Sequence, residues 1–290
     1  MTDTLKMNHL SERARALAMN GEEDRISHIY NWMWVHNSSA EKVEAICRRM
    51  LTTHNPNQAP CLLVIGPTGI GKTALLKHLE KHVFSKNRAI IYFDPRYCTT
   101  YKAFLAQFSK NLNIHVTPKQ IPTNAVLEAE LARVLLLRGV KAIVIDNLHD
   151  LMRGNSVNQR NTLTFLRELS CGSNPVLLLC FGIDKVMSSI RSDEQLERRL
   201  CIYSMPVWRN DSNFLEFLAV IESELPLRKP SGLTDRSKVG FLIAHSHGVT
   251  SGIIEPIKHA AIYAITSGEE RISLAALKIG ASAPFQQEGW

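Results

Sequence analysis

The sequence has no long apolar segment. No uninterrupted apolar stretch reaches about 18 residues, the length at which a bilayer-spanning helix becomes plausible. The first twenty residues, MTDTLKMNHLSERARALAMN, also lack the continuous apolar region of a secretory signal peptide. We therefore expect no membrane contact and a cytoplasmic location.

The sequence also lacks closely spaced cysteine pairs of the kind that bind metals. None of the six cysteines forms a Cys-x-x-Cys pair: Cys47, Cys61, Cys98, Cys171, Cys180 and Cys201. This scatter predicts buried free thiols in a reducing compartment rather than a disulfide framework or zinc site. His78 and His82 share a helix face but have no third ligand nearby in sequence, so we expect solvated surface histidines. Internal repeats and low-complexity segments are absent.

Composition indicates a globular protein with a mild basic excess. The 290 residues are 45% hydrophobic and carry a formal net charge of +7. This length suffices for one large domain, or one domain plus a smaller one. The positive charge permits an acidic partner such as nucleic acid but does not require one.

A phosphate-binding motif stands near the end of the first quarter of the chain. GPTGIGKT fits the pattern G-x-x-x-x-G-K-[ST] and comprises Gly66, Pro67, Thr68, Gly69, Ile70, Gly71, Lys72 and Thr73. The glycines let backbone N–H groups point at phosphate oxygens, Lys72 supplies positive charge, and the Thr73 hydroxyl can ligate Mg²⁺. A plain glycine turn would not explain the Lys-Thr pair, the apolar run before it and the helical pattern after it. We predict that this loop binds ATP with Mg²⁺.

From residue 61 onward, strand and helix patterns alternate. Candidate strands are 61–65, 89–93, 141–145, 176–181 and 201–205, which predicts an α/β fold with a five-stranded parallel sheet. The pattern is helical before it, including one helix expected over 22–36, and again after the Pro/Gly-containing stretch 223–233. The expected domains are an N-terminal helical extension (1–58), a nucleotide-binding domain (59–226), a C-terminal helical lid (227–280) and a tail (281–290).

The segment AIVIDN predicts the other half of the nucleotide site. Asp146 follows a buried strand and can hold Mg²⁺ through a water beside the P-loop. In P-loop ATPases of the AAA+ and RecA-like branch, the next residue is usually a glutamate that polarises the attacking water, whereas here it is Asn147. An amide can orient water but cannot accept its proton, so we expect ATP binding with slow hydrolysis. Neutral variation at Asn147 is the alternative interpretation.

Further segments follow in a specific order: IDNLHDLMRGNSVNQRNTLTFLRELS, FGID, SDEQLERRL, MPVWRND, LPLRKPSGL and SHGVTSGIIEPIKHAAIYAITSGEERIS. Together with GPTGIGKT, and over roughly residues 22–280, they resemble the TnsC/TniB family of AAA+ ATPases from bacterial DNA transposons. The resemblance implies a homo-oligomer, either ring or helical filament, that assembles with ATP on duplex DNA. It also implies that the protein connects a target-selection protein of the TniQ/TnsD type to the transposase.

The resemblance extends to single residues. Gly66, Lys72, Thr73 and Asp146 match the family's nucleotide motif. Arg199, with Arg198 beside it, matches the arginine that reaches into the ATP of the neighbouring subunit. The sequence LERRL alone fits an exposed helical charge pair equally well.

Three positions depart from the family pattern: Asn147, Ile183 and Gly252. All three concern γ-phosphate sensing or hydrolysis rather than ATP binding. Asp184 is the polar residue nearest the end of the fourth strand, and Lys258 is the nearest substitute for the arginine missing at Gly252.

The resemblance places DNA contacts after the second strand. Residues there with cationic or hydroxyl groups suited to backbone phosphates are Arg96, Tyr101, Lys102, Lys119 and Thr123. Each fits a solvated loop or helix position equally well.

Two other classes of protein are compatible with the sequence. One is a helicase loader or replication-initiation ATPase, which recovery with a replicative helicase rather than a transposase would support. The other is a signalling switch that neither hydrolyses ATP nor touches DNA, which a duplex-binding assay would separate.

Overall fold

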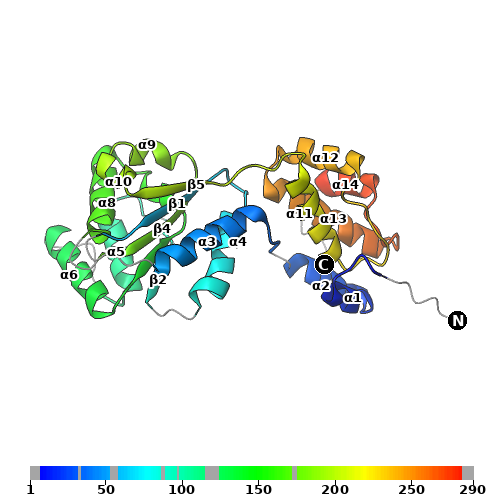
Figure 1. Ribbon diagram of the computed structural model, residues 1–290, viewed down its shortest axis with the longest axis horizontal. Coiled ribbons are helices and arrows are strands. Elements are labelled where there is room, and N and C mark those ends of the chain that lie inside the picture. Colours follow the sequence, from blue (N-terminus) through cyan, green and yellow to red (C-terminus); the bar gives the residue numbers. More distant parts are fainter. Residues whose placement is uncertain are drawn as a thin grey trace. The chain divides into compact units, whose positions relative to one another are not determined.

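The computed structural model describes residues 7–31, 34–52, 58–85, 89–96, 98–114, 124–171 and 175–282. The chain divides into two compact units. Unit 1 comprises Met1–Ser38, Gly69–Gly71 and Pro206–Trp290, and unit 2 comprises Ser39–Thr68 and Lys72–Met205. Figure 1 draws the helices and strands of both units.

Unit 2 is built on a parallel sheet. Its strands are β1 (Cys61–Ile65), β2 (Ile90–Phe93), β3 (Ala142–Ile145), β4 (Leu177–Gly182) and β5 (Leu200–Ser204). They pair in the order β2-β3-β4-β1-β5, and every pairing is parallel. The five-stranded parallel sheet expected from the sequence is confirmed. Because β4 separates β1 from β3, one strand stands between the P-loop strand and the strand that ends before Asp146.

Alternate residues of the buried strands face opposite sides of this sheet. Leu63 of β1 joins a large apolar cluster with residues of α5 (Tyr101–Asn111), α6 (Asn124–Leu137) and α8 (Ser156–Leu169). Figure 1 shows these helices on one side of the sheet and α3 (Ser38–Thr52) and α4 (Lys72–Leu79) on the other. All five residues of β1 are buried, so the P-loop begins at the end of a rigid strand.

Short elements complete unit 2. A π-helical turn, η1 (Glu80–Phe84), extends α4, and the short helices α7 (Leu148–Leu151), α9 (Val186–Ile190) and α10 (Glu194–Glu197) follow β3 and β4. Capping residues explain where two of the longer helices begin. Thr100 accepts a hydrogen bond from the backbone N–H of Ala103 at the start of α5, and Asn155 accepts one from Asn158 at the start of α8.

Unit 1 groups the first two helices of the chain with its C-terminal helices. It contains α1 (Glu12–Ala18), α2 (Glu22–Asn31), α11 (Ser212–Glu224), α12 (Arg236–Ser246), α13 (Thr250–Thr266) and α14 (Leu274–Ser282). Its apolar cluster includes Ile29 of α2, Phe214 of α11 and Ile257 of α13. The helix expected over 22–36 was too long, because α2 ends at Asn31 and Trp34–Asn37 are not helical. The domain boundaries expected from the sequence stay a prediction.

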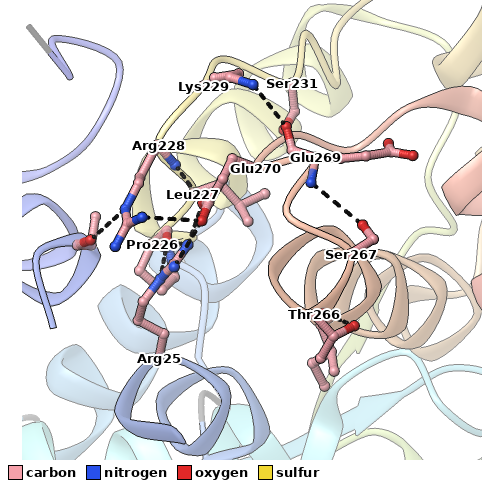
Figure 2. A network of polar contacts seen from close by, with 12 residues as sticks. Arg25, Pro226, Leu227, Arg228, Lys229, Ser231, Thr266, Ser267, Glu269 and Glu270 are labelled. Atoms are coloured by element: carbon pink, nitrogen blue, oxygen red, sulfur yellow. Dashed lines mark hydrogen bonds and ion pairs between the residues drawn. The ribbon is translucent and has the colours of Figure 1, made fainter. Parts of the chain in front are cut away.

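A buried polar network ties α2 to the C-terminal helices. Arg25 is 2% exposed; its Nε donates to the carbonyl of Pro226 at 3.0 Å, and its Nη1 donates to Glu270 Oε1 at 3.0 Å. Arg228 adds a backbone N–H bond to Glu270 Oε2 at 3.3 Å (Figure 2). Burial alone would raise the pKa of Glu270, but hydrogen bonds from Arg25 and Arg228 hold that pKa below its usual range. The network therefore fixes a charge pair across 245 positions of sequence.

We expected buried free thiols and two solvated histidines, and the structure agrees only in part. All six cysteines are free, and Cys47, Cys61, Cys98 and Cys180 are buried, whereas Cys201 is exposed. His78 is not a solvated histidine: its Nε2 lies 3.3 Å from Glu44 Oε2, and its ring lies 4.5 Å from that of His82. Within the described ranges, no group of three or more His, Cys, Asp or Glu side chains could hold a metal ion.

No helix in the described part of the chain is both long and apolar enough to cross a membrane.

Candidate nucleotide site

The P-loop follows β1 and leads into α4. Gly69 and Gly71 have φ angles of +81° and +107°, a region that residues with a Cβ rarely adopt. Gly66 and Ile70 are buried, Pro67 is partly exposed, and Thr68 is exposed. The loop therefore has the glycine-dependent turns that its motif predicts. Two of its residues, Thr68 and Gly69, are exposed to solvent.

Lys72 occupies the first position of α4. Its Nζ donates to the carbonyls of Gly66 at 2.8 Å and Pro67 at 2.9 Å. Burial lowers the pKa of Lys72, while the nearby charges of Asp184 and Asp146 act in the opposite direction. The structure thus brings Asp184 from the end of β4 into the electrostatic environment of the P-loop lysine. The ammonium is held by carbonyls that phosphate oxygens would replace as partners.

Thr73 and Asp146 meet across unit 2. Thr73 Oγ1 donates to Asp146 Oδ2 at 3.3 Å, and the backbone N–H of Asn147 donates to Asp146 Oδ1 at 2.9 Å. Asp146 is 9% exposed, and burial raises its pKa, with the charge of Asp94 adding to the increase. A hydroxyl and one carboxylate suit Mg²⁺, which normally keeps several waters and takes further oxygen ligands from substrate phosphates. These residues therefore fit the ion that the P-loop motif implies.

Asn147 has a local structural reason to be an asparagine. Its backbone is left-handed, with φ 53° and ψ 42°, at the residue that precedes α7. Asparagine enters this conformation more readily than glutamate does, because its short polar side chain tolerates it. The backbone at this position therefore favours the amide, independently of any chemical role.

A cavity of about 920 Å³ lies beside these residues. Thr73, Asp146 and Asn147 line it together with residues from β2 and the segment after it, among them Asp94 and Arg96. Asp94 was not among the site residues predicted from the sequence. Parallel register pairs Phe93 with Ile145, so Asp94 and Asp146 are the next residues along two neighbouring strands. The one feature of the sequence that could have pointed to Asp94 is that Asp94 and Asp146 each directly follow a predicted strand.

The two candidate trans-acting arginines differ in exposure. The Arg198 side chain is 81% exposed, and its Nη2 lies 3.4 Å from Glu194 Oε2. Arg199 is only partly exposed, and its Nη1 is buried without a hydrogen-bond partner among the described residues. Of the two side chains, that of Arg198 is the more exposed.

The residues expected to contact DNA differ in their exposure. Arg96 and Lys102 are exposed, whereas Tyr101 is 2% exposed and its hydroxyl donates to Glu128. A buried, engaged phenol does not suit a phosphate contact, so Tyr101 is removed from the contacts that we propose. Lys119 and Thr123 lie outside the described residues.

Packing within unit 1 explains the absent arginine at Gly252. A Cβ at Gly252 would lie 2.9 Å from Ser246 Cβ and 3.0 Å from Ser246 Cα. No side chain fits there without moving α12 away from α13. Lys258, the nearest cation further along α13, instead approaches the Tyr30 carbonyl at 3.5 Å.

Comparison with protein families decides which group the chain belongs to. A family model described as bacterial TniB protein matches residues 25–210, more than half of the chain. The chain belongs to the TniB family. The match includes the P-loop, Asp146, Asn147 and both candidate arginines, and with the fold it makes this TniB-family protein an AAA+ P-loop protein, a class that implies nucleotide binding. No curated protein sequence matches it significantly.

Solved structures share the fold of this TniB-family protein at low identity. The Aeropyrum pernix ORC2 protein (ADPNP-ADP complexes) is 16% identical, with 91% of this chain and 72% of that chain covered and a TM-score of 0.61. The Aeropyrum pernix ORC1 protein in complex with DNA is 17% identical, with 89% and 68% covered and a TM-score of 0.56. Drosophila ORC bound to DNA is 14% identical, with 91% and 66% covered and a TM-score of 0.61. At these identities the likeness shows the fold alone.

Proposed function

We propose that this protein binds ATP and Mg²⁺ at the P-loop, oligomerises on duplex DNA, and connects a target-selection protein to a transposase during DNA transposition. The observation that carries the proposal is the TniB family match over residues 25–210, joined to a complete P-loop with Asp146 beside it. The target selector would be of the TniQ/TnsD type.

Nucleotide binding depends on three side chains. Lys72 binds the β- and γ-phosphates, while Thr73 and Asp146 hold Mg²⁺. Magnesium bound there neutralises charge that builds up on the phosphate oxygens. Asn147 orients water but cannot remove its proton, so hydrolysis is slow unless another group acts as the base.

Oligomerisation requires a residue that senses the nucleotide of a neighbouring copy. The exposure of the Arg198 side chain supports its assignment to this role, with Arg199 next to it in sequence. An arginine suits the role because its planar guanidinium can bind phosphate oxygens with two parallel hydrogen bonds.

The helices of residues 227–280 act as the lid of the nucleotide domain, and residues 1–58 as its N-terminal extension.

DNA binding is supported by charge and by two exposed cations. The net charge is +7, and two exposed cations are Arg96, three residues after β2, and Lys102, in the first turn of α5. Contacts of this kind bind phosphates without reading sequence. Affinity for duplex DNA should therefore fall with salt, with a log–log slope of roughly −0.9 for each phosphate neutralised.

A filter-binding experiment tests the proposal directly. Labelled duplex DNA is titrated with protein in the presence of a non-hydrolysable ATP analogue, ADP or no nucleotide, at several salt concentrations. We expect tight, salt-dependent retention only with the ATP analogue, and loss of that retention in the Lys72→Ala variant. Retention that is absent under all three conditions would instead support a signalling switch that does not touch DNA.

The second candidate is a replication-initiation or helicase-loading ATPase, favoured by the fold shared with the ORC structures. Affinity purification from cells that contain both a transposase and a replicative helicase separates the two. Recovery of the transposase supports transposition, whereas recovery of the helicase alone supports the alternative.

A further inference from the structure

The cavity beside Asn147 contains a carboxylate with no assigned role. Three carboxylates line it: Asp94, Asp146 and Glu80. Asp146 is the Mg²⁺ ligand in the proposed site. Glu80 begins η1, seven residues beyond Thr73 along a continuous helix, which places it about 10 Å further from the metal position. Asp94 is therefore the carboxylate left to act on a water held near Asn147.

We propose that Asp94 is the general base for ATP hydrolysis in this protein. Its ion pair with Arg96 prevents Asp94 from accepting a proton until Arg96 binds a DNA phosphate. This inference rests on the proposed ATP-binding and DNA-binding function, because it assigns a base and a DNA-dependent control to that same site.

The register of the sheet places Asp94 next to the end of the strand that precedes Asp146. Phe93 pairs with Ile145, and the Asp146 backbone N–H donates to the Phe93 carbonyl at 3.1 Å. Neighbouring strands lie about 4.8 Å apart, so groups just beyond β2 and β3 can share one water molecule. The end of β2 is thus as close to the metal-binding carboxylate as an adjacent strand allows.

Asp94 and Asn147 have different roles in the proposed hydrolysis. Asn147 orients the water through its amide, and Asp94 accepts a proton as the water oxygen bonds to the γ-phosphorus. The bond from that phosphorus to the β,γ-bridging oxygen breaks, and its electron pair leaves with ADP. Asp94 then passes the proton to the phosphate product, which returns the carboxylate to its charged state.

Arg96 restrains both oxygens of the carboxylate. Its Nε lies 2.7 Å from Asp94 Oδ2, and its backbone N–H donates to Asp94 Oδ1 at 3.2 Å. Because each oxygen of the carboxylate already accepts a contact from Arg96, fewer of its lone pairs are available to accept a proton from water. The Arg96 side chain is 66% exposed, so a DNA phosphate can compete for it. Binding of DNA would then release Asp94 and accelerate hydrolysis.

His149 and Asp150, the ionisable residues that follow Asn147 closely in sequence, lie elsewhere. His149 lines a different cavity, next to α8 and α9, and Asp150 Oδ1 lies 2.9 Å from Arg153 Nη2. Neither His149 nor Asp150 lines the cavity that contains Asn147 and Asp94.

Single-turnover hydrolysis with radiolabelled ATP, with and without duplex DNA, tests the inference in the full-length protein. We expect Asp94→Asn to lower the DNA-stimulated rate about 100-fold, the range typical of losing a general base. Asp94→Glu should restore part of that rate. Glu80→Gln removes a carboxylate from the same cavity and should leave the rate unchanged. Arg96→Ala should raise the DNA-free rate about tenfold and abolish stimulation by DNA, as expected when the base is no longer restrained.

Binding of a fluorescent ATP analogue is measured in parallel for each variant. Unchanged affinity in Asp94→Asn, together with the lost rate, supports a chemical role. A normal rate in Asp94→Asn, or a wild-type chain that binds ATP but never hydrolyses it, overturns the inference. A wild-type chain that does not bind the analogue contradicts the proposed function itself, which is a separate result.

Discussion

Thr73 donates a hydrogen bond to Asp146 at 3.3 Å, which links the first turn of α4 to the end of β3. This contact joins the two halves of the nucleotide motif that lie 73 positions apart in the sequence. It brings together a hydroxyl and a carboxylate, two groups that suit Mg²⁺, at the end of β3, which β4 separates from β1.

Replacing Lys72 should abolish ATP binding. Its ammonium is the positive charge that the motif directs at the β- and γ-phosphates, so Lys72→Ala removes the main cationic contact. Titration with a fluorescent ATP analogue should show at least a tenfold loss of affinity, or about 1.4 kcal/mol. Lys77→Ala, an exposed cation on the same helix, is the matched control and should bind normally. Equal affinity in Lys72→Ala and wild type would rule out this role for Lys72.

Loss of Arg198 should separate ATP binding from assembly. The side chain is 81% exposed and can reach a neighbouring copy, so Arg198→Ala should bind ATP normally but fail to oligomerise. Arg199→Ala should assemble better than Arg198→Ala, because Arg199 is partly buried. Sedimentation velocity with a non-hydrolysable ATP analogue distinguishes them. Normal oligomers in a protein that carries both substitutions would remove the trans-acting arginine from this segment.

Truncating Arg25 should loosen unit 1. Arg25→Ala leaves Glu270 buried with fewer partners, a change that costs about 3 kcal/mol in comparable buried pairs. Amide hydrogen exchange in α2 should therefore increase. Arg228→Ala, whose side chain is 41% exposed, should have the smaller effect expected of a surface pair. Identical exchange in wild type and Arg25→Ala would mean that the pair contributes nothing to local stability.

The same network predicts a loss of stability in acid. The pKa of Glu270 is lowered in the folded protein, so its ionised form stabilises the fold above the unfolded value of about 4.3. That contribution disappears as the pH falls through the folded pKa. Glu270→Gln should flatten the acid side of a plot of unit 1 exchange against pH. An unchanged acid dependence in this variant would assign it to other carboxylates.

The backbone at Asn147 predicts which substitutions it tolerates. Asn147→Glu places a longer side chain at φ 53° and should lower stability by about 1 kcal/mol. Asn147→Gly should be tolerated better, since glycine adopts this conformation without a steric penalty. Thermal unfolding followed by circular dichroism compares the two variants. A glutamate variant as stable as the glycine variant would show that backbone strain does not favour asparagine here.

Local patterns in the sequence predicted the sheet, but contacts distant in sequence could not be predicted from it. The ends of the five observed strands lie within one residue of those expected from the sequence, although β5 has no buried residue. The grouping of α2 with the C-terminal helices involves partners such as Glu270, which no local pattern reveals. Burial of Tyr101 against Glu128 is a tertiary effect of the same kind. Asp94 was missed because its importance comes from strand register rather than from a motif.

Electron microscopy of the protein with duplex DNA tests the central claim most directly. Samples of wild type and Lys72→Ala are imaged with a non-hydrolysable ATP analogue, with and without DNA. We predict regular rings or helical filaments on DNA for wild type with nucleotide, and none for Lys72→Ala. Dispersed single particles for wild type in every sample, under conditions where the analogue is bound, would contradict ATP-dependent assembly on DNA.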